Sequence, residues 1–181
     1  MMLLSFSIRR AFSLLELLVT IMIVSIVYFL GFNGIEKEEK RPQTLTPLNL
    51  KTTIQNSAFF RGEGTLLCVN ECQSCYFRTT IDSAFQAYKN KIDLYGTKVY
   101  TLDSQNSLQE QDAGRYQDHK ICLVMDFYQN GSTSQLILET PQGIYFLPAF
   151  FGEPQKVDSL DEAKALWLKA NDLASGSGDF Y

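Results

Sequence analysis

Four cysteines carry the most concentrated chemistry in this sequence of 181 residues. Cys68, Cys72 and Cys75 lie together in the segment CVNECQSC, and Cys122 follows much later in the chain. Cysteines this close together serve as metal ligands, as redox pairs or as disulfides. A zinc site usually draws on two close pairs, whereas here three ligands are close and one is distant. An all-cysteine zinc site with Cys122 as the fourth ligand therefore stays open as the minor alternative.

Two cofactor sites that use such cysteines are not expected. The spacing C-x3-C-x2-C also holds the iron–sulfur cluster of radical S-adenosylmethionine enzymes, but that cluster needs a reducing compartment and a large barrel. The segment RGEGT is a lone turn-like stretch, not a glycine-rich cofactor strand. Covalent attachment of haem through C-x-x-C-H is excluded because Tyr76 follows Cys75. We therefore predict no cofactor and no metal.

The favoured interpretation is two disulfides in an exported domain. Four cysteines allow three pairings. Cys68 and Cys122 lie within predicted strands, whereas Cys72 and Cys75 lie at a predicted hairpin turn. We expect Cys72–Cys75 as a short clip and Cys68–Cys122 as a long-range bridge, which stabilises by roughly 4 kcal/mol in the chain-entropy model. The C-x-x-C spacing also leaves thiol–disulfide exchange open.

No constellation of residues points to catalysis. His119 is the single histidine, and we expect it to begin a strand at the surface beside the ordinary loop acid Asp118. The sequence contains no nucleophile elbow, no phosphate loop and no paired histidine motif. The net charge of −4 does not favour binding to a nucleic-acid backbone. The sequence therefore predicts neither an enzyme nor a nucleic-acid partner.

A long apolar run near the N-terminus contains one carboxylate, Glu16. From Phe12 to Phe32 there are 21 residues with that single charge, about 31 Å as a helix, which matches a hydrocarbon core of about 30 Å. Arg9 and Arg10 precede the run, which favours an inside N-terminus and an outside C-terminal domain. A cleaved secretory signal is excluded because the run is too long and no A-x-A-like site follows it. A plain signal anchor would explain everything here except Glu16.

The segment RRAFSLLELLVTIMIVSIVYFLG (residues 9–31) resembles the N-terminal signature of type IV prepilins and type II secretion pseudopilins. In that family a basic leader ends in a small residue, and the mature chain begins with an N-methylated Phe and has Glu at its fifth position. The resemblance places cleavage between Ala11 and Phe12, methylation on Phe12, and Glu16 fifth. Ala11 stands where the family usually has Gly, and the leader MMLLSFSI is unusually apolar.

The resemblance implies a structural subunit of a type IV pilus or a type II secretion pseudopilus. Its partners would be the prepilin peptidase, other subunits that contact the N-terminal helix, and the bacterial inner membrane, with the C-terminal domain in the periplasm. Glu16 would pair with the α-amino group of Phe12 on a neighbouring subunit or on its own chain. The sequence after residue 35 lacks the smooth long helix of a major pilin, so a minor pilin or pseudopilin is favoured. The alternatives are a subunit of a DNA-uptake filament, a functional subtype that charge does not favour, and a non-polymerising, membrane-anchored exported binding or thiol-redox module.

Three segments must position these residues. Residues 1–11 form the leader, 12–41 the transmembrane and assembly helix, and 42–181 the exported domain. Pro42 and Pro47 end the first helix near Lys40. A second helical segment is expected at Leu48–Phe60.

The rest of the chain is expected to contain short strands and a final helix. The runs TLLCV and CYFRTTI predict a hairpin, KVYTL another strand, and KICLVMDFY, SQLILET and GIYFLPAF a three-stranded meander. Between these groups, SAFQAYKNKI reads as a short helix and DSQNSLQEQDAGRYQD as an exposed loop.

DSLDEAKALWLKANDL predicts the C-terminal helix, with a capping box at Ser159 and Glu162. Its expected apolar face consists of Leu160, Ala163, Leu166, Trp167, Ala170 and Leu173. Trp167 is expected to pack in the core. The predicted fold class is α+β and pilin-like: an N-terminal membrane-spanning helix packed on a small antiparallel β-sheet, with a C-terminal helix.

Overall fold

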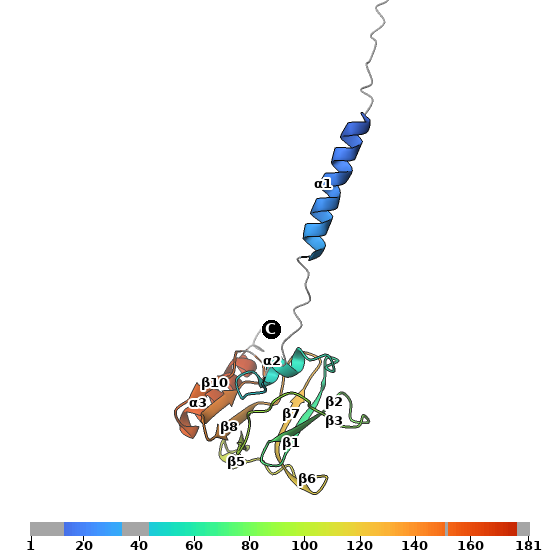
Figure 1. Ribbon diagram of the computed structural model, residues 1–181. Helices are drawn as coiled ribbons and strands as arrows, with labels where there is room; N and C mark the ends of the chain where they lie inside the picture. Colours follow the sequence, from blue (N-terminus) through green and yellow to red (C-terminus); the bar gives the residue numbers. More distant parts are fainter. Residues whose placement is uncertain (1–12, 34–43, 151, 177–181) are drawn as a thin grey trace, which may run out of the picture. The chain divides into compact units, whose positions relative to one another are not determined.

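The structure is a computed structural model that describes residues 13–33, 44–150 and 152–176. The chain divides into two compact units, Met1–Arg41 and Pro42–Tyr181. We describe each unit by itself. Figure 1 shows the elements and their labels.

The first unit contains the helix α1 (Leu14–Asn33). Large apolar residues occupy every face of its described part, from Leu14 to Val27, and they are about half exposed or more. The rest of the predicted helix, to residue 41, lies outside the described residues. In the part of the chain that the structure describes, no helix combines the length and hydropathy needed to cross a membrane. The predicted membrane-spanning helix is therefore not found.

The second unit is mostly β, and its described residues form two antiparallel sheets of five strands each. The first sheet has the order β3-β2-β1-β7-β6 and consists of β1 (Gly64–Val69), β2 (Ser74–Arg78), β3 (Gln86–Ala87), β6 (Arg115–Tyr116) and β7 (His119–Phe127). The second sheet has the order β10-β9-β8-β4-β5 and consists of β4 (Lys98–Leu102), β5 (Leu108–Glu110), β8 (Leu136–Thr140), β9 (Gly143–Leu147) and β10 (Gln155–Val157). The predicted α+β class with one small sheet is wrong.

The predicted strands exist, but one of them lies in a different sheet from the one expected. The hairpins β1–β2 and β8–β9 and the strand β4 are confirmed. The three-stranded meander is wrong, because β7 pairs with β1 and β6 while β8 pairs with β4 and β9. The linker QNGSTS does turn the chain back, because Phe127 and Thr133 form an antiparallel bridge and the Ser134 N–H donates to the Asp126 carbonyl at 2.9 Å. The pairing with β7 ends there, and the next strand, β8, pairs with β4 and β9. The chain therefore changes sheets between Phe127 and Leu136.

Three segments contribute strands that the sequence did not predict, and one of them is β10, which pairs with β9. SAFQAYKNKI is not a helix but contains β3, which pairs with β2. The expected exposed loop after it contains β5 and β6, which pair with β4 and β7. These strands are only two or three residues long, so they show no alternation of apolar and polar residues. Their backbone hydrogen bonds to longer neighbours define them instead.

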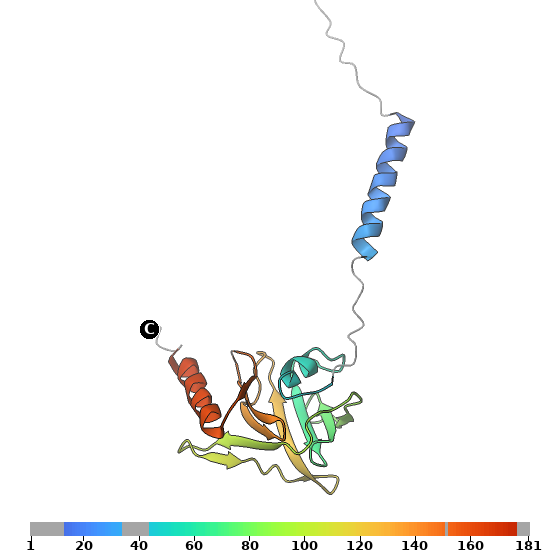
Figure 2. The ribbon, with the colours of Figure 1, turned by 60° about the vertical axis from the view of Figure 1, so that its left-hand side comes forward.

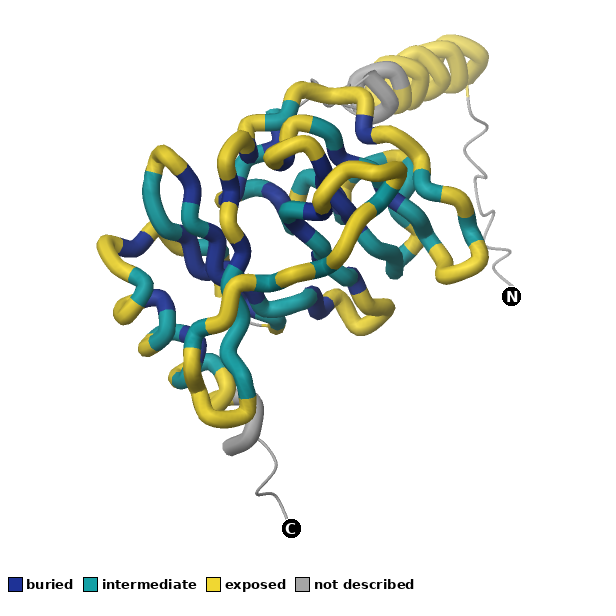
Figure 3. Tube along the Cα trace, turned by 90° about the horizontal axis from the view of Figure 1, so that it is seen from below, coloured by how far each residue is buried: buried dark blue, intermediate teal, exposed yellow. Residues whose placement is uncertain are grey.

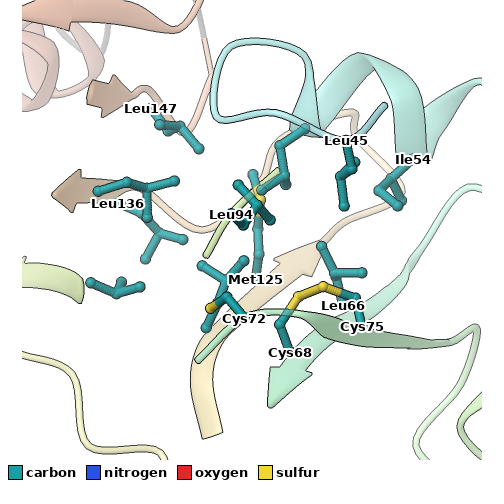
Figure 4. Close-up of a cluster of buried hydrophobic side chains, with 14 of the residues drawn as sticks. Leu45, Ile54, Leu66, Cys68, Cys72, Cys75, Leu94, Met125, Leu136 and Leu147 are labelled. Atoms are coloured by element: carbon teal, nitrogen blue, oxygen red, sulfur yellow. A yellow bond between two sulfur atoms is a disulfide. The ribbon is translucent and has the colours of Figure 1, made fainter. Parts of the chain in front are cut away.

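The main core lies between the inner faces of the two sheets. Alternate residues point into it, such as Leu66 of β1, Met125 of β7 and Leu138 of β8, all fully buried. Figure 4 shows this cluster, to which Leu45 and Leu94 contribute from segments outside the strands. The intervening residues of each strand face outward into two smaller clusters, as a strand period of two requires.

The C-terminal helix α3 (Leu160–Gly176) covers the outer face of the second sheet. Figure 2 shows it beside β9 and β10. The prediction that Trp167 packs in the core is confirmed, because its ring lies 6.5 Å from that of Phe146, centre to centre. The predicted cap is also present: Ser159 Oγ accepts the Glu162 N–H at 3.1 Å. Leu173 is 65% exposed, so the apolar face ends at Ala170, one turn earlier than expected.

A short helix, α2 (Leu50–Gln55), closes one end of the main core. It is shorter than the predicted segment Leu48–Phe60, although Leu50 and Ile54 are fully buried as one helical face. Leu45 before it forms a parallel bridge with Ile92. Figure 3 shows the buried positions gathered inside this unit and the exposed ones at its turns.

Candidate functional site

The predicted processing residues Ala11 and Phe12 lie outside the described residues, but the start of α1 is described. Ser13 precedes the helix, and its Oγ accepts the backbone N–H of Glu16 at 3.2 Å. Ser13 therefore caps the helix, with Glu16 at the third helical position, the arrangement of a capping box. Sequence reasoning missed Ser13, although the pattern S-x-x-E before an apolar run is the signal for such a cap.

Glu16 is the single charged residue of α1. The hydroxyls of Thr20 and Ser25 donate to the helix's own carbonyls of Leu17 and Ile21, each at 2.8 Å. These hydroxyls therefore add little polarity to the surface of the helix. A carboxylate in the first turn interacts favourably with the helix dipole, so Glu16 stabilises this end of the helix whatever else it does.

All four cysteines are in disulfides, as predicted, but the pairing differs from the predicted one. The bonds join Cys68 with Cys75 and Cys72 with Cys122. The predicted pairs, Cys72–Cys75 and Cys68–Cys122, are wrong.

The reason is that Cys75 lies within β2 and not in the turn. With the four-residue connection Asn70–Gln73, Cys68 and Cys75 become directly opposite residues of the hairpin, and their Cα atoms are 4.0 Å apart. Figure 4 shows this disulfide inside the core, with Cys72 nearby.

A β-bulge points Cys122 toward Cys72. In the ladder between β1 and β7, Cys68 pairs with Leu123 and Val69 pairs with Ile121, so Cys122 is the extra residue. A bulge reorients the side chains on either side of it. Leu123 accordingly faces the main core, whereas Ile121 faces the outer cluster on the other side of the sheet. Cys122 packs against the main core, where Cys72 is fully buried.

The turn that carries Cys72 has an unusual backbone. Asn70, Glu71 and Cys72 all have positive φ angles, of 54°, 53° and 63°. Left-handed residues other than glycine normally occur singly and cost roughly 1–2 kcal/mol each. Here the turn is held by the disulfide of Cys72 and by the Gly96 N–H, which donates to the Glu71 carbonyl at 3.0 Å. The Glu71 carboxylate also accepts a hydrogen bond from Tyr95 and raises the pKa of that phenol.

The disulfides remove the metal alternatives for these cysteines. A sulfur in a disulfide is not a thiolate, so neither a zinc ion nor an iron–sulfur cluster has its ligands here. Among the residues that the structure describes, no group of three or more His, Cys, Asp or Glu residues could hold a metal ion. Thiol–disulfide exchange needs access to a sulfur. Cys68, Cys72 and Cys75 are at most 2% exposed, so the Cys68–Cys75 bond is inaccessible, whereas Cys122 is half-buried and lines a hollow.

His119 begins β7 at the surface, as predicted. Gln117 and Asp118 before it form a two-residue turn with φ angles of 48° and 63°, which joins β6 to β7. This is the geometry of a tight hairpin, and Asp tolerates it well. The histidine and its neighbouring acid therefore serve as the start of a strand and its turn.

A groove of about 350 Å³ lies beside the end of β2. It is lined by Phe59, Arg61, Phe77, Arg78, Thr79, Ser83, Ala84 and Gln86. We call it the arginine groove, because it has two guanidinium groups and no acidic residue in its lining. Gly64 packs against the Phe77 ring so closely that a Cβ at this position would clash with it. Sequence reasoning missed this groove, since Arg61 and Arg78 belong to no motif.

Glu139 and Tyr100 form a hydrogen-bonded pair between two strands of the second sheet. The Tyr100 hydroxyl, on β4, donates to the Glu139 carboxylate, on β8, at 2.8 Å. Burial of the phenol, together with this hydrogen bond and the nearby charges of Glu139 and Glu110, raises the pKa of Tyr100 to about 12. The pair ties the neighbouring strands β4 and β8 of the second sheet together.

Comparisons with protein-family models, with curated proteins and with solved structures found no match to this chain.

Proposed function

We propose that this chain is a structural subunit, a minor pilin or pseudopilin, of a type IV pilus or a type II secretion pseudopilus. In this proposal the prepilin peptidase cuts between Ala11 and Phe12, and Phe12 becomes N-methylated. The globular unit lies outside the cytoplasm, in the periplasm before assembly. The fold of that unit is the two-sheet arrangement described above.

The observation that supports the proposal most is the surface of α1. Eleven large apolar side chains from Leu14 to Val27 are 48–77% exposed, on every side of the helix: Leu14, Leu15, Leu17, Leu18, Val19, Ile21, Met22, Ile23, Val24, Ile26 and Val27. A helix that is apolar all round needs to be covered by other apolar groups. Packing against the same helix of neighbouring subunits would cover these side chains, and in a filament every subunit has such neighbours.

Glu16 then has a role in the order of assembly. A carboxylate inside an apolar helix bundle is costly unless a cation pairs with it. Cleavage before Phe12 creates an α-amino group four residues away along the chain, on every subunit. A subunit that is uncut or out of register lacks the pairing of Glu16 with such a group, so its Glu16 would be buried without a cation, which is unfavourable. The charge therefore couples processing to assembly.

The globular unit fits an exported, non-catalytic subunit. Two disulfides persist in oxidising compartments and are rare in the cytosol. A filament subunit needs stability outside the cell more than it needs chemistry. The two disulfides and the position of His119 at the start of a strand are consistent with that role.

Determination of the mature N-terminus tests the proposed processing, and variants of Glu16 test the proposed role in assembly. Intact mass and N-terminal sequencing should show a chain that begins with methylated Phe12. Glu16→Val should leave the protein folded and processed but reduce its incorporation into filaments about tenfold or more, since a buried unpaired amino group remains. Incorporation is measured by the amount of subunit that sediments with sheared filaments.

Glu16→Gln separates the charge from the cap. Glutamine also suits the third position of a capping box, so it preserves the start of the helix but removes the charge. The proposal predicts that Glu16→Gln assembles as poorly as Glu16→Val. Normal assembly of the glutamine variant would assign Glu16 to helix capping alone.

A second candidate is a non-polymerising exported binding module, which the arginine groove favours. An uncut N-terminus on the exported protein, together with no sedimentation with filaments, would support this candidate over the first. The Cys68–Cys75 bond is buried and gives no support to a redox version of it.

A further inference from the structure

The arginine groove has two features that a purely structural surface does not need. Arg61 and Arg78 both line it, while the chain as a whole is acidic with a net charge of −4. In the described part of the chain neither guanidinium has a carboxylate within ion-pair distance. Two cations therefore face the same hollow without an anion between them.

Arg78 is held in place rather than free. Its Cζ lies 4.7 Å from the centre of the Phe85 ring, and its Nη1 donates to the Ile81 carbonyl at 3.2 Å. Stacking on an aromatic ring fixes the plane of a guanidinium. The side chain is half-buried, so its position is set before any ligand arrives.

One donor of Arg78 lacks an acceptor. Its Nε atom is buried and has no hydrogen-bond partner in the described structure. Buried polar groups are nearly always paired, so such an atom marks a place where a partner is missing. A carboxylate that binds a guanidinium edge-on accepts from two N–H groups at once.

The rest of the groove suits the body of a peptide. Arg61 is exposed and donates through Nη1 to the Ala58 carbonyl at 3.1 Å, so its other N–H groups can reach a ligand. The Ser83 hydroxyl donates to the Thr80 carbonyl at 2.8 Å and lies 3.5 Å from the Thr79 hydroxyl, so these two side chains form a small polar cluster at the groove. Phe59 and Phe77 supply apolar contact next to the charges. A groove with this mixture binds a carboxylate attached to an apolar group better than a bare ion.

We propose that the arginine groove binds a peptide carboxylate, with Arg78 and Arg61 as its two cationic contacts and Phe59 as an apolar contact for the adjoining side chain. The ligand class is an acidic or carboxylate-bearing segment of a partner protein. The site lies in the globular unit and does not depend on whether the chain assembles into a filament.

The test is a titration of the full chain in detergent micelles with N-acetyl-L-phenylalanine, followed by the backbone amide signals of Thr79 and Ser83. Binding should be saturable. N-acetyl-L-phenylalaninamide, which lacks the carboxylate, should bind about tenfold more weakly or worse. Inorganic phosphate should also bind more weakly, because it gains no contact with Phe59.

Arg78→Gln and Arg61→Gln should each weaken binding about tenfold or more. Arg61 is exposed, so its variant keeps the test valid even if Arg78→Gln lowers stability. Arg115→Gln is the matched control: this arginine is exposed on β6 and does not line the groove, and its variant should bind as the native chain does. The proposal is overturned by the absence of saturable binding, by equal binding of the amide, by tighter binding of phosphate, or by unchanged binding in both glutamine variants.

Discussion

Cys122 shows how one extra residue decides the pairing of every cysteine in this protein. Without the bulge at Cys122, the alternation of β7 would keep Ile121 and Leu123 on the same face. With it, the two residues face different clusters, and Cys122 packs beside the buried Cys72. The connectivity of the disulfides is thus a property of strand register, which the spacing of cysteines in the sequence does not encode.

The single residue Tyr100 leads to a prediction about how the stability of the protein depends on pH. Its pKa is about 12 in the folded protein and about 10 in an unfolded chain. The raised pKa contributes stability that is fully present below pH about 10. This contribution is lost as the pH rises toward about 12, since the unfolded chain releases the proton first.

Tyr100→Phe removes this contribution while keeping the ring. The free energy of unfolding of the variant should therefore fall less steeply with pH above about 10 than that of the native chain. Denaturant titrations at several alkaline pH values measure the difference, and the ultraviolet absorbance of phenolate reports the titration directly. Parallel pH dependence in the two proteins would contradict the assignment.

At the scale of elements, the helix α3 was the most predictable part of the chain. Its capping residues, Ser159 and Glu162, and its helical apolar face act within one segment, so the sequence contains the whole signal. The carboxylate of Glu162 also accepts the Asp158 N–H at 2.9 Å, which completes the cap. Trp167 then docks the helix on β9 through Phe146.

Ser159→Ala should cost about 1 kcal/mol of stability, the usual value for loss of a cap. Trp167 is the single tryptophan, so its fluorescence follows the docking of α3 during urea unfolding. Ser104→Ala is the control, because Ser104 lies in an exposed turn outside any helix. Equal loss of stability in the two variants would contradict a specific role for the cap.

Strands that form only because a neighbouring strand pairs with them could not be predicted from the sequence. The strands β3, β5 and β6 are too short to show a period and exist because β2, β4 and β7 offer them hydrogen bonds. The arginine groove combines Arg61, before β1, with Arg78, at the end of β2, and only the β1–β2 pairing brings them together.

At the scale of the whole molecule, the two disulfides constrain very different lengths of chain. Cys68–Cys75 closes a separation of 7 residues within one hairpin, whereas Cys72–Cys122 spans 50 residues. The second bond joins the β1–β2 turn to β7 and also holds the left-handed residues Asn70 and Glu71 at its end. It should therefore contribute more to global stability.

Replacing both cysteines of a pair by alanine measures this difference. In the chain-entropy model, loss of Cys72–Cys122 should cost roughly 4 kcal/mol and loss of Cys68–Cys75 roughly 2 kcal/mol. Urea unfolding of the two double variants, each with no free thiol, gives the comparison. A larger loss for the Cys68 and Cys75 variant would overturn this ranking and call for a different pairing.

The strands of the two sheets alternate along the chain, with β1–β3 and β6–β7 in one sheet and β4–β5 and β8–β10 in the other. During synthesis the ribosome delivers Cys68, Cys72 and Cys75 long before Cys122. In that interval Cys72 can be oxidised before its native partner, Cys122, is present. The bonds that it can then form, with Cys68 or Cys75, are non-native. Correct oxidation of this protein therefore depends on timing, and a cell that makes it needs either delayed oxidation or an isomerase that reopens early bonds.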